Sequence, residues 1–180
     1  VQRDAVVAIN PQDPANVVVA AEDSRYGPEN GSGVGFYTST DGAVTFVGGS
    51  ITAPEDWESA DPALAADGSG NFYLAHASFN LADGVGGIYV SKSTNGGLTF
   101  GDPVALLTHL RAGVNDFEEM PDIAVDTSGG DYDGNVYVTW TTDFAGGGQA
   151  VRFARSTDGG LTFEAPIRVD DGGADALGSS

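Results

Sequence analysis

The sequence contains no cysteine and very few basic residues. Without cysteine, the chain can form no disulfide and no thiolate zinc site, and it has no cysteine nucleophile. Lys92 is the single lysine, and it stands with six arginines against 26 acidic residues, for a formal net charge of -19. A field of this sign repels phosphate backbones, so we expect no nucleic-acid partner.

Long apolar runs are also missing. No stretch approaches the roughly 18 apolar residues that a membrane helix needs, so we expect no membrane insertion. The 27 glycines and 8 prolines indicate many turns. The first residue is Val1 rather than Met, which indicates a processed protein or a fragment. The acidity has three interpretations: a solubilising surface, a high-salt source, or calcium binding.

Internal repeats are the main signal in this sequence. Three copies of one eight-residue motif recur roughly 60 residues apart, at Ser39–Phe46, Ser93–Phe100 and Ser156–Phe163. Two apolar runs precede each copy. The first runs are Asp4–Asn10, Asp61–Asp67 and Pro121–Asp126, and the second are Asn16–Ala20, Asn71–Ala75 and Asn135–Thr139. A repeat of this length made only of strands predicts propeller blades.

The predicted fold is all-β, with blades of four antiparallel strands: residues 1–57, 58–117 and 118–169, followed by a linker at 170–180 toward a further blade. One stretch departs from this pattern, because Val104, Leu106, Leu107 and Leu110 fit a short helical turn. Propellers close with typically 4–8 blades. We therefore expect further blades to complete the ring, from additional sequence or, as the alternative, from other copies of the chain.

The eight-residue motif has the chemistry of a tight hairpin. Its Asp can accept hydrogen bonds from turn amides and from Ser or Thr hydroxyls, its Gly tolerates a left-handed backbone, and we expect its Phe to bury its ring and to hold the hairpin to the blade. The motif resembles the Asp box, or BNR repeat, of sialidase-like propellers, although Ala43 replaces the Gly in the first copy and Asn95 the Asp in the second. The resemblance implies a structural role for Ser39, Asp41, Thr45, Phe46, Ser93, Asn95, Thr99, Phe100, Ser156, Asp158, Thr162 and Phe163.

Polar residues gather where the chain enters the first strand of each unit. In propellers the entry loops meet at one face of the ring, where ligands bind. The ligand-binding candidates are Arg3, Asp4, Trp57, Asp61, Glu118, Glu119 and Asp122. Such carboxylates raise one another's pKa or recruit a cation, which favours a calcium site, a general acid or a polar-ligand pocket, and Trp57 is able to stack on a sugar ring. The alternative is a solvated acidic rim.

A second candidate site follows the first apolar run of the third repeat. Asp131, Asp133 and Asn135 alternate around Gly134, as at the start of a calcium loop, although the Glu that an EF-hand requires is absent. The alternative is a hairpin turn without metal.

The resemblance to sialidases also bears on activity. Enzymes of that family carry an Arg-Ile-Pro motif in the first blade, two further arginines and a Tyr–Glu pair, whereas Arg3 is followed here by Asp4 and Ala5. No catalytic residue is assigned, and whether the chain is an enzyme stays open. The resemblance implies an extracellular or cell-surface propeller that binds carbohydrate or processes glycosides. The alternative is a non-catalytic propeller for protein interactions in a cell-surface, filament or multiprotein assembly.

Overall fold

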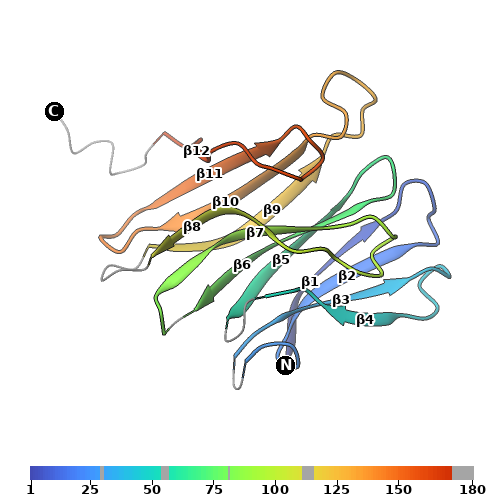
Figure 1. The fold of residues 1–180 in the computed structure, drawn as a ribbon, viewed down its shortest axis with the longest axis horizontal. Coiled ribbons are helices and arrows are strands. Elements are labelled where there is room, and N and C mark those ends of the chain that lie inside the picture. Colours follow the sequence, from blue (N-terminus) through green and yellow to red (C-terminus); the bar gives the residue numbers. More distant parts are fainter. Residues whose placement is uncertain (29–30, 54–56, 81, 111–115, 172–180) are drawn as a thin grey trace.

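Three four-stranded antiparallel sheets make up the chain in its computed structural model, which describes residues 1–28, 31–53, 57–80, 82–110 and 116–171 (Figure 1). Their orders are β1-β2-β3-β4, β5-β6-β7-β8 and β9-β10-β11-β12. The strands are β1 (Gln2–Ile9), β2 (Val17–Asp23), β3 (Val34–Ser39), β4 (Val47–Ser50), β5 (Glu58–Ala66), β6 (Phe72–Asn80), β7 (Val85–Ser93), β8 (Val104–Leu110), β9 (Phe117–Val125), β10 (Val136–Asp143), β11 (Gln149–Ser156) and β12 (Ile167–Arg168). The predicted all-β blades of four antiparallel strands are confirmed.

The three sheets stack face to face through their first strands. β5 lies against β1 and β2, and β9 lies against β5 and β6. First strands of successive sheets are therefore neighbours, as they are around the axis of a propeller. Residues 172–180 of the predicted linker lie outside the described residues, and no helix in the described part is long and apolar enough to cross a membrane.

Two apolar cores fill the spaces between the sheets. Between the first and second sheets, Ala20, Val34, Phe36 and Ile51 meet Leu74. Between the second and third sheets, the buried members are Ala63, Tyr73, Ala75, Ala77, Ile88, Val90, Leu106, Ile123, Val136, Val138, Trp140 and Ala154. Because β-branched and aromatic side chains suit a pleated, buried surface, these residues both favour strands and supply the packing between them.

The eight-residue motifs form the hairpins between the third and fourth strands. Asp41 accepts hydrogen bonds from the amides of Val44 and Thr45 at 3.0 and 2.9 Å and from the Thr45 hydroxyl at 2.6 Å. The bond from Thr45 is the main reason why the pKa of Asp41 lies well below its usual value. Asp158 makes the same bonds in the third hairpin. The carboxylate thus ties the turn together.

The Phe of the motif lies at the contact between two sheets. The Phe100 ring lies 4.9 Å from the ring of Phe36, which belongs to the preceding sheet. Phe163 packs against the core between the second and third sheets. Phe46 has no preceding sheet within the chain and is 45% exposed. The rings of Phe100 and Phe163 thus pack on apolar cores that their own sheet shares with the preceding sheet.

The expected helical turn at Val104–Leu110 was also wrong, since these residues form β8 and pair with β7. The register of that pairing shifts between Ile88 and Tyr89, whose partners are Leu107 and Ala105, so Leu106 forms a bulge. Leu106 is buried and Leu107 is packed against the same core. A bulge thus brings two consecutive leucines to the core and breaks the alternation from which a strand would have been predicted.

Candidate functional site

Each first strand is interrupted at the same place by a β-bulge. Asp4 in β1, Asp61 in β5 and Met120 in β9 have φ values of 51°, 52° and 52°. The strand register shifts beside each of them. Left-handed backbone is uncommon for residues other than glycine, and a bulge redirects the side chains around it. Three equivalent bulges therefore set the side-chain directions at one end of the stacked first strands.

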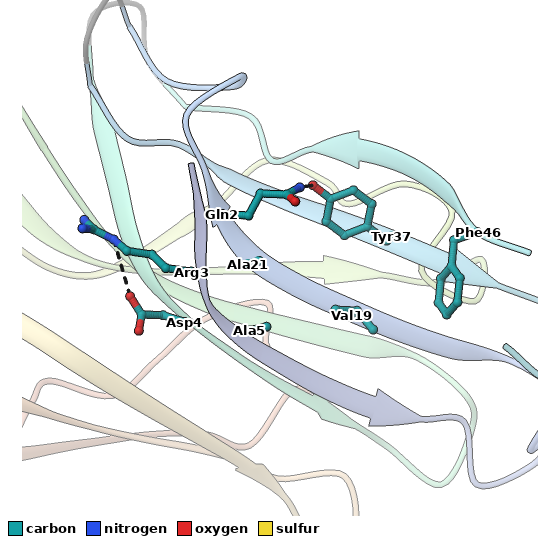
Figure 2. A pocket seen from close by; sticks show the side chains of 8 residues that line it. All are labelled: Gln2, Arg3, Asp4, Ala5, Val19, Ala21, Tyr37 and Phe46. Atoms are coloured by element: carbon teal, nitrogen blue, oxygen red, sulfur yellow. Dashed lines mark hydrogen bonds and ion pairs between the residues drawn. The ribbon is translucent and has the colours of Figure 1, made fainter.

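Three carboxylates from two sheets meet at these bulges. Oxygen atoms of Asp4, Glu22 and Asp61 all lie within 4.8 Å of one another. Arg3 donates through Nε to Glu22 at 2.6 Å. The same Nε lies 3.6 Å from a carboxylate oxygen of Asp4, a pair that Figure 2 shows. The hydrogen bond to Glu22 is the main reason why the pKa of Arg3 is raised. One guanidinium against three carboxylates leaves this carboxylate group with an excess of negative charge, and hard cations prefer such oxygens.

The bulge amides join each sheet to the one before it. The amide of Asp61 donates to Glu22 at 3.3 Å, and the amide of Met120 donates to Asp61 at 3.1 Å. Each carboxylate therefore accepts a hydrogen bond from the following blade. This ladder holds the polar groups in fixed positions along the stacked first strands.

Glu119 of the third sheet extends the group formed by Arg3, Asp4, Glu22 and Asp61. We call these residues, together with Glu119 and its neighbour Asp143, the polar rim. Burial raises the pKa of Glu119, and so do the charge and hydrogen bond of Asp143 and the charge of Asp61. A carboxyl group in this state retains its proton to a higher pH than a free glutamate does. The rim thus combines the Asp4, Glu22 and Asp61 carboxylates with one group that is able to donate a proton or a hydrogen bond.

The structure brings together some of the predicted ligand-binding residues. Arg3, Asp4 and Asp61 meet, and Glu119 lies near Asp61. They lie in the first strands themselves and not in loops, so the predicted loop location was wrong. The reason is that each strand continues through its bulge, where polar residues interrupt the apolar pattern, and such an interruption is also typical of a loop before a strand.

Three other predicted residues make contacts of their own. Trp57 packs edge-on against Tyr89, with ring centroids 6.2 Å apart. Glu118 is buried and accepts a hydrogen bond from the Thr142 hydroxyl at 2.7 Å. Asp122 pairs with Thr139 on the exposed side of the third sheet. Glu118 and Glu119 are neighbours in β9, and the alternation of side chains along a strand gives them different surroundings.

Two members of the rim were missed from the sequence. Glu22 and Asp143 both lie near the end of the second strand of their sheets. The available signal was the acidic pair Glu22 and Asp23, which ends the apolar run from Val17 to Ala21. The ends of the second strands meet the same rim, so acidic residues there deserved the same weight as those of the first strands.

The proposed calcium loop makes a turn in the described structure. Asp133 accepts the amide of Gly129 at 3.0 Å, and Asn135 donates to the Tyr137 hydroxyl at 3.2 Å. Among the described residues, the acidic group compact enough for a shared cation is the Asp4, Glu22 and Asp61 group. Calcium at Asp131, Asp133 and Asn135 stays a prediction.

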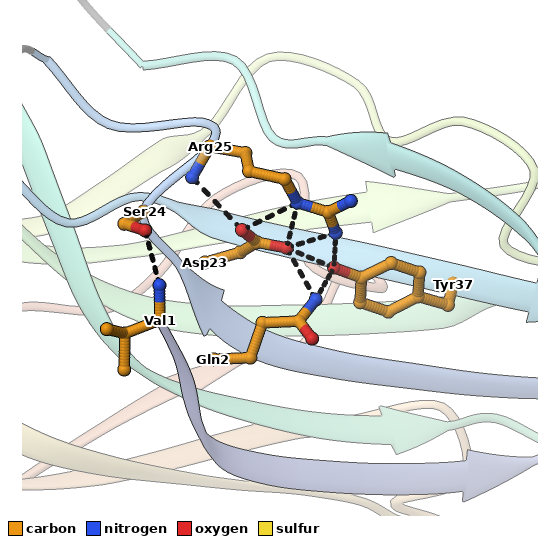
Figure 3. Close-up of polar contacts among 6 residues, drawn as sticks. All are labelled: Val1, Gln2, Asp23, Ser24, Arg25 and Tyr37. Carbon is orange, nitrogen blue, oxygen red and sulfur yellow. Dashed lines mark hydrogen bonds and ion pairs between the residues drawn. The ribbon is translucent and has the colours of Figure 1, made fainter.

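A second polar cluster lies on the face of the first sheet that no other sheet covers. The carboxylate of Asp23 is buried, and it accepts hydrogen bonds from Arg25, from Tyr37 and from Gln2 at 2.7 Å (Figure 3). The bond to Arg25 is the main cause that holds the pKa of Asp23 far below its usual value. Burial raises the pKa of Tyr37. This tyrosine therefore keeps its proton and is a poor nucleophile.

Beside this cluster the first sheet is hollowed. A hollow of about 470 Å³ is lined by apolar and polar side chains, including Val19, Tyr37 and Phe46 (Figure 2). Val7, which pairs with Val19, is 62% exposed. An exposed surface of this kind marks a site of interaction more often than a solvated face.

Solved structures with a similar fold include two sialidases. A Hadza microbial sialidase is 14% identical, with a TM-score of 0.67, and the match covers 93% of this chain and 38% of that one. The leech intramolecular trans-sialidase is 10% identical, with a TM-score of 0.66, and the match covers 97% of this chain and 44% of that one.

A third similar structure is the endo-arabinase of Bacteroides thetaiotaomicron, at 21% identity and a TM-score of 0.58, where the match covers 87% of this chain and 59% of that one. No protein-family model and no curated protein matches the chain. The chain thus spans less than two thirds of each of these structures. Because identities this low show the fold alone, the conclusion concerns architecture: the chain has a sialidase-like β-propeller fold.

Proposed function

We propose that this chain supplies part of the ligand-binding face of a glycan-directed propeller, one that binds carbohydrate or processes glycosides. The observation that carries the proposal is the meeting of Asp4, Glu22 and Asp61 with Arg3 at the bulges of the first two blades. Carboxylates accept hydrogen bonds from sugar hydroxyls, and a guanidinium binds an anionic substituent. Glu119, with its raised pKa, adds a group able to donate a proton.

The similar structures support the same class of ligand. Their names describe sialidases and an endo-arabinase, which act on carbohydrate. We further propose that the three hairpins are Asp boxes with a structural role, since Asp41 and Asp158 are engaged by their own turns. An extracellular or cell-surface location belongs to the same proposal.

Glycan binding is tested with a glycan array, and turnover with fluorogenic glycosides. Asp61→Asn keeps an acceptor for the Met120 amide but removes a charge from the rim, so it should lower binding. Asp102→Asn is the matched control, because Asp102 is exposed and lies in the chain segment between β7 and β8. If neither binding nor turnover is found, or if both variants lose binding equally, the proposal fails.

Calcium is the cation that this oxygen chemistry would select. Thermal unfolding with added calcium and with chelator tests it, since a ligand of the native state must raise the melting temperature. Asp61→Asn should abolish a shift that arises from the carboxylate group, whereas Asp131→Asn should abolish one that arises from the turn. An unchanged melting temperature removes calcium from both places.

The alternative is a non-catalytic propeller for protein interactions. The exposed apolar side chains of the first sheet favour it, among them Val7, Ile9 and Val47. Glycan binding that depends on Asp61 would exclude protein interaction as the main role of the rim. Substitutions at Val7 that abolish binding of a protein partner would support the alternative.

A further inference from the structure

The uncovered face of the first sheet repeats the faces that are covered in the other two. Val7 pairs with Val19 across β1 and β2, as Leu64 pairs with Leu74 and Ile123 with Val138 in the following sheets. Leu74 and Val138 are fully buried, whereas Val19 at the same place in the first sheet is only partly buried and its partner Val7 is 62% exposed. The first sheet therefore presents the same kind of surface that receives a blade elsewhere in this chain.

The hairpins at the edge of these faces are also equivalent. Ala43, Gly97 and Gly160 each donate their amide to the Ser that begins the motif, at 2.9, 2.9 and 2.8 Å. Their φ values are 66°, 81° and 82°. Gly97 and Gly160 are buried, and Ala43 is exposed. At this position the first hairpin thus differs from the others by one methyl group, and no other sheet of the chain covers it.

The covered hairpins show what a neighbouring blade requires. The Thr38 hydroxyl donates to the carbonyl of Gly97 at 2.5 Å, and the Lys92 amine donates to that of Gly159 at 2.7 Å. A Cβ on Gly97 would lie 2.2 Å from Val18, and one on Gly160 would lie 2.8 Å from Tyr73. Val18 and Tyr73 hold the same place in β2 and β6. A side chain of that size therefore demands glycine opposite it.

The third sheet of a second copy meets this requirement poorly. Its residue at the place of Val18 and Tyr73 is Tyr137, whose ring would meet the methyl group of Ala43. Its residue at the place of Val6 and Ala63 is Asp122, as the strand pairing shows. Burying a carboxylate in that apolar contact is costly. Arg155, at the place of Lys92, already binds Glu164 at 2.7 Å.

We propose that the uncovered face of the first sheet is a docking surface for a further four-stranded blade that is not the third sheet of a second copy. That blade carries a residue no larger than alanine opposite Ala43. It has an apolar residue in place of Asp122 and a hydrogen-bond donor for the carbonyl groups of Gly42 and Ala43. This blade would pack on the first sheet as the first sheet packs on the second and the second on the third, where Val18 meets Gly97 and Tyr73 meets Gly160.

A modified third sheet serves as the probe for this surface. The double change Asp122→Ala and Tyr137→Ala gives that sheet two of the three stated features, the small residue opposite Ala43 and the apolar residue in place of Asp122. Sedimentation equilibrium measures association of the full chain. Wild type should remain monomeric. The double variant should form dimers, with an association constant higher by about tenfold or more. Circular dichroism checks that each variant is folded.

Two further variants locate the contact. Val19→Asp, added to the double variant, places a charge on the face and should abolish the dimer. Val44→Asp, at an exposed place on the tip of the same hairpin, is the matched control and should leave it unchanged. The proposal is overturned if wild type dimerises as tightly through Val19, if the double variant stays monomeric, or if both charged variants lose association equally.

Discussion

The size limit at the hairpins leads to a quantitative prediction for Gly97→Ala. The added methyl group would lie 2.2 Å from Cγ2 of Val18 and 3.2 Å from the Thr38 hydroxyl. The backbone at Gly97 has a φ of 81°, which costs a residue with a Cβ about 1–2 kcal/mol. Overpacking adds about 1–3 kcal/mol. We therefore expect the free energy of unfolding to fall by about 2–5 kcal/mol.

Gly42→Ala separates the two contributions. Gly42 has a φ of 76°, and a Cβ there would meet nothing within 4 Å. This variant should lose only the backbone part, about 1–2 kcal/mol. Val18→Ala in the Gly97→Ala background should recover much of the overpacking, because it removes the atom that the methyl group meets.

Equilibrium urea unfolding of wild type, the three variants above and the single variant Val18→Ala gives the comparison, with the slope checked for constancy. A double-mutant cycle of Gly97 and Val18 isolates their interaction. Equal losses for Gly97→Ala and Gly42→Ala would refute the reasoning, and so would a Val18→Ala change that gives no relief. Either result would mean that the blades separate readily at this hairpin, and the size argument for Ala43 would fail with it.

Three other predictions concern titration and the hairpins. Burial lowers the pKa of His76 to about 4, so the folded state holds this side chain neutral, and the free energy of unfolding should fall by about 3 kcal/mol between pH 6.5 and pH 4. His76→Phe should remove this pH-dependent loss in denaturation series across the range. An unchanged dependence of stability on pH would be the contrary result. The pKa of Glu119 is raised, so the folded state binds its proton more tightly than the unfolded state does, and stability falls as pH rises above 4.5. Glu119→Gln should reduce this fall in the same denaturation series, and a steeper fall would contradict the prediction. Asp158→Asn should lower the melting temperature less than Asp158→Ala, because Asn95 already makes comparable bonds in the second hairpin; equal losses by calorimetry would count against this.

Features that depend on neighbours in sequence were predictable. The repeated hairpin requires left-handed residues after its Asp or Asn, and Gly42, Gly96 and Gly159 supply them. Strands flanked by such turns follow from local hydrogen bonding and side-chain shape. Where a bulge interrupts this local code, as at Leu106, the prediction failed, because a bulge has no signal within its own few residues.

The amino-acid sequence alone determined the repeats, the strands and the hairpins, since each is stabilised mainly by contacts within one unit. Only the tertiary structure decided that Asp4, Glu22 and Asp61 meet, because that distance depends on how two sheets stack and where their bulges fall. It also decided which faces are covered. Phe46 and Phe100 occupy the same place in the repeat, yet one is exposed and the other lies on Phe36, since burial depends on a blade that local sequence does not specify.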